Sequence, residues 1–237
     1  MYGKATHSWS GRSFISCLGV LTLLASLVLT ACGGSSGPPD VNAAQAGVVS
    51  LNPQSWYILY GADMPDHPSP SSAGAWSMTL PGEPGSINYV QTPYTPASLP
   101  NSTASLPTEV SITFRIDSSS GAVYNGEVDP AAVDPATFHL FLERQGDDFT
   151  QDYYRWWADT GGYVLGSKDN SVVTIEVPLT PDKWSSVYGH HDSAEFAATL
   201  KNLAWVGITF GGDNFWGHGV NMLGGTATFT LIDFRVE

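Results

Sequence analysis

Residues 110–116 read VSITFRI, and this stretch decides the fold class. Every second residue is apolar, which is the period of a β-strand that buries one face. The same period recurs in residues 173–179 and 206–210, and weaker strand patterns occupy residues 56–60, 76–80, 87–91 and 138–143. Turns rich in Pro, Gly, Asn and Asp separate these segments. The sequence therefore predicts an all-β domain built from antiparallel strands.

One short helix is expected between the strands. Asp192 can cap its first turn, and Glu195 follows three residues later, which is a spacing typical of helix starts. Phe196, Leu200 and Leu203 recur at the spacing of one helix face. A single short helix among many strands indicates an antiparallel sandwich with one crossover helix.

The last strand pattern, residues 226–236, changes phase along its length. Ala227, Phe229 and Leu231 define one face, whereas Phe234 and Val236 continue on the opposite parity. A β-bulge produces such a slip, because one extra residue shifts every later side chain to the other face. The polar residue beside the predicted bulge is Asp233.

The composition of the chain argues against nucleic-acid binding and favours a single domain with a hydrophobic core. The chain has 237 residues, with 9 Lys and Arg against 22 Asp and Glu, and a formal net charge of −13. Nucleic-acid binding requires a basic surface, so we expect no nucleic-acid partner. A hydrophobic content of 42% is enough for a substantial core, and the length suits one large β domain.

The first 32 residues have the order of an export signal. Lys4 and Arg12 precede an apolar run over residues 14–29, which is shorter than the roughly 20 residues that span a bilayer. The ending Leu-Thr-Ala-Cys at residues 29–32 resembles the bacterial lipobox, which implies a lipid anchor on Cys32. An ordinary signal peptide that happens to contain a cysteine is the alternative.

The predicted organisation follows from this leader. Residues 1–32 are the lipoprotein signal peptide, residues 33–50 a flexible Gly-, Ser- and Pro-rich tether, and residues 51–237 the β-sandwich domain. The partner implied by Cys32 is a membrane, reached through the acyl chains. Because Gly follows the cysteine where inner-membrane retention uses Asp, we expect the cell envelope, at the outer membrane or cell surface.

Aromatic residues supply the candidate ligand site. In a strand, Tyr153, Arg155 and Trp157 of the run YYRWW would point to one face. His139 and Trp205 are likewise out of phase with the apolar residues of their segments. Sugars expose CH-rich faces and hydroxyls, which suit aromatic rings beside hydrogen-bonding groups. These five residues form the predicted platform, unless their rings simply pack the core or its lid.

The glycine-rich segment GGDNFWGHG, residues 211–219, adds Trp216 to the candidate ligand residues. Glycine permits a close approach of the backbone, and the neighbouring Asp, Asn and His offer hydrogen bonds. As a plain turn between strands, the segment needs no ligand. Both interpretations stay open at this point.

Catalytic signatures are weak. Asp147 with Asp148, and Glu127 with Asp129, are carboxylate pairs, which glycosidases need about 5–9 Å apart. Neighbouring carboxylates on turns are more often solvated. Neither a His-Glu-x-x-His motif nor a cysteine nucleophile is present in the domain. We assign no catalytic residue and expect a binding domain rather than an enzyme.

The segment from Asp169 to Glu237 resembles the jelly-roll carbohydrate-binding modules and the wider galactose-binding-like group. The resemblance rests on a strand ending in Pro-Leu and followed by Trp184, a short helix, the strand at residues 204–210, and a closing strand that contains Asp233. It implies an antiparallel two-sheet jelly-roll sandwich with one short crossover helix, and a polysaccharide or other glycan as the ligand.

The same resemblance implies a structural calcium ion, for which Asp233 would be a metal ligand. Calcium takes six to eight oxygen ligands, so further residues must contribute. Asp63, Asp66 and Asp117 are candidates. The alternative is that Asp233 is a solvated or hydrogen-bonded strand residue.

The leading hypothesis is a membrane-anchored lipoprotein whose β-sandwich binds carbohydrate without cleaving it. A structural or protein-interaction module of an envelope complex is the first alternative. A glycan hydrolase with a divergent acid pair is the second.

Overall fold

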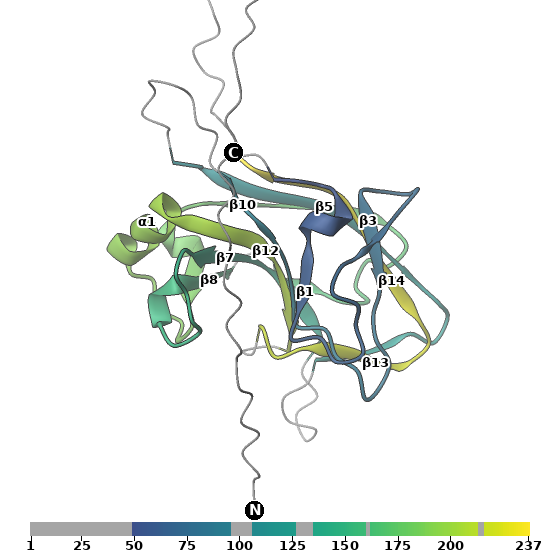
Figure 1. Cartoon of the computed structure of the whole chain (residues 1–237). Helices are drawn as coiled ribbons and strands as arrows, with labels where there is room; N and C mark the ends of the chain where they lie inside the picture. Colours follow the sequence, from purple (N-terminus) through teal and green to yellow (C-terminus); the bar gives the residue numbers. More distant parts are fainter. Residues whose placement is uncertain (1–48, 96–105, 127–134, 160–161, 213–215) are drawn as a thin grey trace, which may run out of the picture. The chain divides into compact units, whose positions relative to one another are not determined.

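The computed structural model describes residues 49–95, 106–126, 135–159, 162–212 and 216–237 (Figure 1). These residues form a β-sandwich in which every pairing between named strands is antiparallel, and they contain one α-helix. The predicted fold class is therefore confirmed. Cys32, the signal and most of the tether lie outside the described residues, so the lipid anchor stays a prediction.

The larger sheet has seven strands in the order β1-β4-β12-β7-β8-β11, with β9 paired to β7. Its strands are β1 (Tyr57–Leu59), β4 (Tyr89–Pro93), β7 (Thr137–Arg144), β8 (Arg155–Ala158), β9 (Tyr163–Val164), β11 (Trp184–Ser186) and β12 (Leu203–Gly211). The second sheet has five strands in the order β10-β5-β14-β3-β2. Its strands are β2 (Ser69–Pro70), β3 (Trp76–Thr79), β5 (Glu109–Ser118), β10 (Val172–Pro178) and β14 (Ala227–Val236).

The remaining elements are short. They are the strand pair β6 (Val123–Gly126) and β13 (Val220–Gly224), the helix α1 (Ser193–Lys201), and the 3-10 turns η1 (Pro53–Ser55), η2 (Asp152–Tyr154) and η3 (Pro181–Lys183). In the described part of the chain, no helix is long and apolar enough to cross a membrane.

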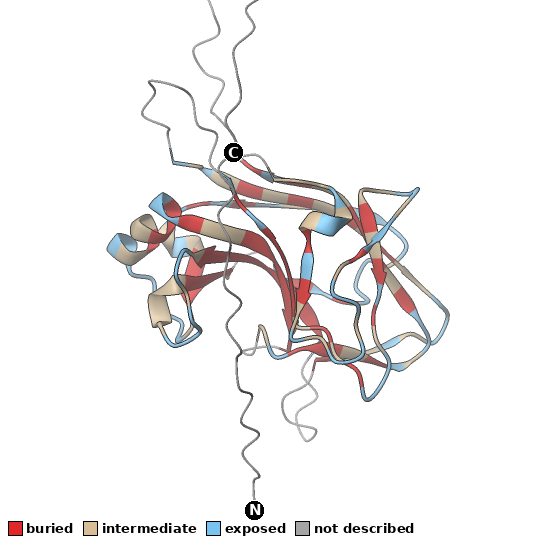
Figure 2. Ribbon diagram, viewed as in Figure 1, coloured by how far each residue is buried: buried red, intermediate tan, exposed pale blue. Residues whose placement is uncertain are grey.

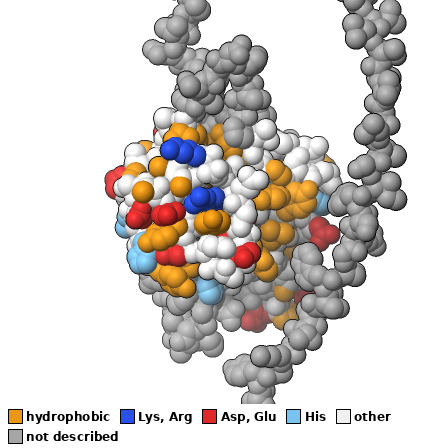
Figure 3. All heavy atoms as spheres, turned by 60° about the vertical axis from the view of Figure 1, so that its left-hand side comes forward, with side chains coloured by type: hydrophobic (Ala, Val, Ile, Leu, Met, Phe, Trp, Pro, Cys, Tyr) orange, Lys and Arg blue, Asp and Glu red, His pale blue; other side chains and the backbone are white. Residues whose placement is uncertain are grey.

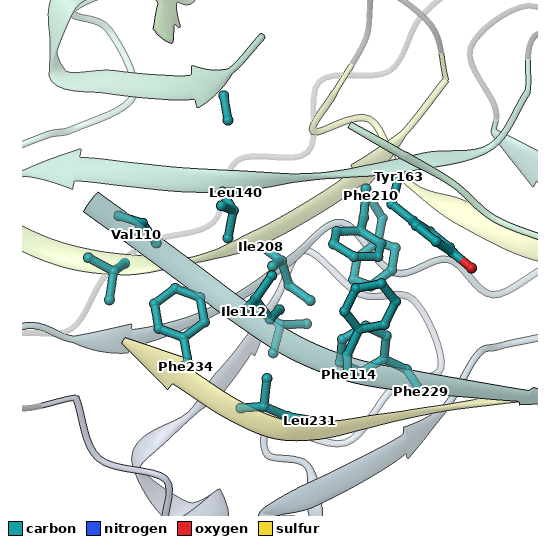
Figure 4. Close-up of a cluster of buried hydrophobic side chains, with 14 of the residues drawn as sticks. Val110, Ile112, Phe114, Leu140, Tyr163, Ile208, Phe210, Phe229, Leu231 and Phe234 are labelled. Atoms are coloured by element: carbon teal, nitrogen blue, oxygen red, sulfur yellow. The ribbon is translucent and has the colours of Figure 1, made fainter. Parts of the chain in front are cut away.

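The core lies between the two sheets, where the alternating apolar residues of both meet (Figure 4). Phe114 of β5 contacts Phe138 of β7 edge to face, with ring centroids 4.8 Å apart, and stacks on Phe229 of β14 at 5.4 Å. All three rings are completely buried. Burying such a ring stabilises the fold by roughly 1.5–3 kcal/mol, so this aromatic layer is a main source of cohesion between the sheets.

The predicted helix is present, with one difference at its end. The Asp192 carboxylate accepts hydrogen bonds from the backbone N–H groups of Ala194 and Glu195, both at 2.9 Å. The helix ends at Lys201, so Leu203 lies in β12 instead of on the helix. α1 crosses over from β11, at the edge of the larger sheet, to β12 in its interior.

The predicted bulge is confirmed in β14. Its register against β5 shifts between Leu231 and Asp233, so Leu231 lies opposite Phe114 while Asp233 lies opposite Thr113. Both halves of the strand thereby keep their apolar residues in the core, as the phase change in the sequence requires.

Strand β7 departs from the alternation that marks the other long strands. In β5, buried residues alternate with half-buried ones, but seven consecutive residues of β7 are buried, from Thr137 to Glu143. All four residues of β8 are buried as well. Figure 2 shows this difference along the ribbons. The outer face of the larger sheet is therefore covered, and the site described below lies there.

Candidate functional site

The outer face of the larger sheet carries large side chains in matched positions. Phe141 of β7 lies opposite Gly207 of β12 and Trp157 of β8. One pleat along, Glu143 lies opposite Trp205 and Arg155. Residues directly opposite on one face of a sheet are close enough for their side chains to interact. The strand registers thus gather aromatic and charged residues on one surface.

A second hydrophobic cluster, separate from the core, occupies this face. Tyr89, Phe141 and Trp157 form its buried centre. The Phe141 ring lies 5.3 Å from that of Tyr89 and 5.4 Å from that of Trp157, centroid to centroid. The Trp157 indole Nε1 donates a 3.0 Å hydrogen bond to Thr209 Oγ1, which fixes the orientation of the ring. We call these three residues the outer aromatic cluster.

A groove of about 510 Å³ opens above the outer aromatic cluster. Tyr89, Arg155 and Trp157 line it from the sheet, residues 185–189 form one wall, and residues 216–218 form the other. The volume lies in the range of small-molecule sites, about 300–1,000 Å³. Aromatic rings, hydroxyls and one guanidinium therefore converge on a space of ligand size.

Polar contacts hold the wall of residues 185–189 in place. Asp152 of η2 accepts hydrogen bonds from Ser186 Oγ at 2.7 Å and from the backbone N–H of Tyr188 at 3.3 Å. The other Asp152 oxygen lies 2.9 Å from His190 Nδ1. Ser185 Oγ donates to Asp159 at 2.5 Å. The wall is thus tied to the residues that flank β8.

The opposite wall rests on the sheet through ring contacts. Trp216 stacks on His139, with ring centroids 4.4 Å apart and planes inclined by 22°. A side chain on Gly217 would place its Cβ 2.4 Å from the Tyr89 hydroxyl, so glycine is needed for this close approach. His139 Nδ1 lies 2.9 Å from the carbonyl of Ala158. Burial lowers the pKa of His139, which favours its neutral form.

A charged cluster lies beside the groove, where Arg155 faces two carboxyl groups. Arg155 Nε is 3.0 Å from Asp147 Oδ2, and the Arg155 guanidinium carbon lies 4.7 Å from the centroid of the Phe149 ring. Glu143 is the cross-strand neighbour of Arg155. We call Glu143, Asp147 and Arg155 the acid–arginine cluster.

Burial perturbs both carboxyl groups of this cluster. Desolvation, followed by the nearby charge of Asp147, raises the pKa of Glu143 to about 7, while Gln91 and Arg155 act in the opposite direction. Desolvation also raises the pKa of Asp147, and the charge of Arg155 opposes that shift. Glu143 can therefore change its ionisation state near neutral pH.

Unsatisfied polar atoms concentrate in the same place. Among the described residues, six buried side-chain nitrogen or oxygen atoms have no hydrogen-bond partner, and four belong to this region: Gln91 Oε1, Glu143 Oε2, Asp147 Oδ2 and Arg155 Nε. The Asp147–Arg155 contact is close enough for an ion pair but lacks the alignment of a hydrogen bond. Buried polar atoms without partners are rare in native proteins, so their concentration here distinguishes this region from the rest of the described chain.

Comparisons with known proteins do not identify this chain. No protein-family model matches it, and no curated protein or solved structure is significantly similar to it. Its site must therefore be interpreted from its own geometry.

The structure brings together most of the residues that the sequence singled out. His139, Arg155, Trp157 and Trp205 share the outer face of the larger sheet, and Trp216 lies on it through its stack with His139. Trp205 is on this face but not among the residues that line the groove. Its ring packs edge-on against Tyr57 at 5.8 Å.

Tyr153 lies apart from this group. Residues 152–154 form the 3-10 turn η2, so the strand parity that relates Arg155 to Trp157 does not extend back to Tyr153. The Tyr153 ring instead lies 6.1 Å from that of Trp156 and 5.8 Å from that of His190.

Sequence reasoning missed several residues of the site. Glu143 has the parity of His139, so strand alternation was a signal that could have placed it on the same face. Tyr89 was within a recognised strand, but its pairing with β12 joins segments more than 100 residues apart. Tyr188 lies on a loop without periodicity and carries no such signal.

The predicted calcium ligand has other partners. Asp233 Oδ2 lies 2.6 Å from Arg235 Nε, and Asp233 Oδ1 accepts a hydrogen bond from the backbone N–H of Phe234. Asp117 is paired with Arg115 at 2.7 Å. In the described parts of the chain, no group of three or more His, Cys, Asp or Glu side chains could hold a metal ion. Calcium at Asp233 therefore stays a prediction from the resemblance.

A second depression, of about 550 Å³, lies around Tyr124 and Asp169. Most of its lining residues are small, and Tyr124 supplies the one aromatic ring among them. The Tyr124 hydroxyl is already engaged with Asp169, which helps burial to raise its pKa. This depression offers far less for ligand recognition than the groove.

Proposed function

We propose that this protein is a membrane-anchored lipoprotein whose β-sandwich binds a glycan in the groove over the outer aromatic cluster, without cleaving it. The observation that carries the proposal is the groove itself. Trp157, Tyr89 and Trp216 present aromatic rings to one space, beside the hydroxyls of Ser185 and Ser186. The proposed anchor rests on the lipobox-like sequence that ends at Cys32.

The chemistry of the lining suits a sugar. Aromatic rings stack on the CH-rich faces of pyranose rings, and a few polar groups orient the hydroxyls. Trp157 is held by its hydrogen bond to Thr209, and the 185–189 wall by Asp152. A groove held in place before binding loses little conformational entropy when the ligand enters.

Hydrolysis is the second candidate function, because a carboxyl group with a pKa of about 7 suits a general acid. Two observations favour binding alone. No carboxylate is among the described residues that line the groove. The Asp147 side chain, the natural partner of Glu143, is fully buried. Release of reducing sugar by the wild type but not by Glu143→Gln would favour the hydrolase instead.

A protein-interaction role is the remaining alternative. Figure 3 shows several groups of exposed hydrophobic side chains with charged side chains beside them, on the side of the molecule that carries α1. A protein partner that uses these side chains and not the groove is a different binding mode. Variants of groove residues would then leave its binding unchanged.

The direct test uses Tyr188, which lines the groove and is 76% exposed. Tyr188→Ala should weaken glycan binding about tenfold, or roughly 1.4 kcal/mol, while the fold is unaffected. Leu223→Ala is the matched control, because Leu223 is 54% exposed and lies outside the groove on β13. Glycan arrays would find ligands, and isothermal titration would measure affinities. If the wild type binds no glycan, the proposal is wrong.

A further inference from the structure

The charge of the groove decides which glycans it can accept. Arg155 is the single Arg or Lys side chain among the described residues that line it. A sugar carboxylate or sulfate buried here would need a strong cationic partner, and arginine is the residue best suited to that contact. The acceptance of an acidic sugar therefore depends on whether the charge of Arg155 is available.

Arg155 is already engaged by a carboxylate and by an aromatic ring. Its Nε lies 3.0 Å from Asp147 Oδ2, and its side chain is 10% exposed while that of Asp147 is fully buried. The ring of Phe149 covers the guanidinium carbon at 4.7 Å. Interactions between buried charges are weakly screened by salt, so Asp147 compensates Arg155 at any ordinary ionic strength.

Glu143 adds a second carboxyl group to the same place. It lies opposite Arg155 on the neighbouring strand and is 6% exposed. With Asp147 ionised in its pair with Arg155, the acid–arginine cluster has no net charge while Glu143 is protonated. When it is ionised, the cluster carries one net negative charge. In neither state does the cluster leave positive charge for a ligand.

The net charge of the chain also disfavours the binding of anionic ligands. Its formal net charge is −13, so its long-range field repels anions from the surface. The hydroxyls of Ser185 and Ser186, which line the groove, donate their protons to Asp159 and Asp152, so toward a sugar their oxygens act as uncharged hydrogen-bond acceptors.

We propose that the groove is specific for uncharged saccharides, and that Asp147 and Glu143 set this specificity by compensating the charge of Arg155. The inference rests on the proposed glycan-binding function and deepens it, because it names the class of glycan. Uronic acids and sulfated sugars are excluded because Glu143 and Asp147, which do not line the groove, compensate the charge of Arg155, which does.

The experiment compares pairs of oligosaccharides that differ only in charge. Oligomers of polygalacturonate, polyglucuronate and alginate are each titrated beside their carboxyl-reduced, uncharged forms. The wild type is expected to bind the reduced member of at least one pair at least tenfold more tightly than the acidic member. Equal or tighter binding of the acidic members would overturn the inference while leaving glycan binding intact.

Variants of Glu143 and Asp147 test whether the acid–arginine cluster causes the preference for uncharged saccharides. The double variant Glu143→Gln/Asp147→Asn keeps the shape of both side chains and frees the charge of Arg155, so the preference for the uncharged member should fall at least tenfold. The amide oxygen of Asn can still accept the hydrogen bond that Asp147 Oδ1 receives from the backbone N–H of Phe149. An unchanged preference in this variant would overturn the inference.

A control separates the local charge from the net charge of the chain. Glu109→Gln/Glu176→Gln removes two negative charges from β5 and β10 in the other sheet, which is at least as large a change in net charge, and it should leave the preference unchanged. An equal effect of both double variants would assign the specificity to the overall field and overturn the role of the cluster. If the wild type binds no glycan on an array that includes these pairs, the proposed function fails, and this inference fails with it.

Discussion

The two sheets of the sandwich have inner faces of the same kind but outer faces that differ. On the five-stranded sheet, the outer face carries small polar and charged residues, such as Thr113 and Thr174, whose hydroxyls share a 2.9 Å hydrogen bond at an exposed position. On the seven-stranded sheet, the corresponding face carries Tyr89, Phe141 and Trp157, and all three are buried.

We infer from this difference that the outer face of the seven-stranded sheet carries the proposed ligand site. The stability of a sandwich requires only that the inner faces be apolar, and an antiparallel sheet can expose its outer face to water. The five-stranded sheet follows this rule. The seven-stranded sheet instead buries aromatic side chains on its outer face, and residues 185–189 and 216–218 line a groove over them.

The largest predicted change is in the free energy of unfolding, and it tests whether the outer aromatic cluster stabilises the fold as core residues do. Trp157→Ala should reduce the free energy of unfolding by about 3–5 kcal/mol, because it empties a buried site. Thr113→Ala on the other outer face should change it by only about 0.5 kcal/mol. Equilibrium unfolding in urea measures both. Similar small losses in the two variants would show that the two faces do not differ energetically.

The second prediction concerns the pH dependence of stability that Glu143 causes. Folding raises the pKa of Glu143 from 4.5 to about 7, so the folded state binds this proton more tightly than the unfolded state. Its contribution to stability is therefore complete below pH 4.5 and is lost as the pH rises through about 7.

Glu143→Gln should abolish this contribution. Relative to the wild type, the variant should gain about 3 kcal/mol of unfolding free energy between pH 4 and pH 8. Glu176→Gln, at an exposed position of β10, should give a flat difference over the same range. Unfolding curves at several pH values would measure both, and a flat difference for Glu143→Gln would exclude a buried carboxyl group at this position.

The smallest expected change is in glycan affinity, and it follows from the close contact between the wall of residues 216–218 and Tyr89. Gly217→Ala would place a methyl group 2.4 Å from the Tyr89 hydroxyl, so the Tyr89 ring or the wall must move. We expect glycan affinity to fall about fivefold, or roughly 1 kcal/mol. Gly121→Ala is a poor control because its φ is +83°, whereas Gly82→Ala meets no close atom and should leave affinity unchanged. Titration calorimetry on both variants would detect the difference.

Local patterns in the sequence predicted much of the fold. The alternation in residues 110–116 identifies β5 because one face of that strand is buried, and the phase change near Leu231 identifies the bulge in β14. The cap at Asp192 marks the helix start. Each of these signals lies within about ten residues, so no tertiary information is needed.

The candidate site depends on contacts that such patterns do not contain. Strand parity put Arg155 and Trp157 on one face, but it assigned Tyr153 to the same face because nothing local revealed the turn η2. The pairing of Tyr89 with Thr209 depends on a register between distant strands. The contact of Asp147 with Arg155 depends on how a loop folds back over the sheet.

The proposed function requires that a glycan bind in the groove over the outer aromatic cluster. Indole N–H resonances report it directly, because the described tryptophans include two in the groove, Trp157 and Trp216, and four buried in the core: Trp56, Trp76, Trp156 and Trp184. Titration with a bound oligosaccharide should shift the Trp157 and Trp216 signals in a saturable way and leave the four core signals in place. Saturable binding that moves neither groove indole would contradict the account.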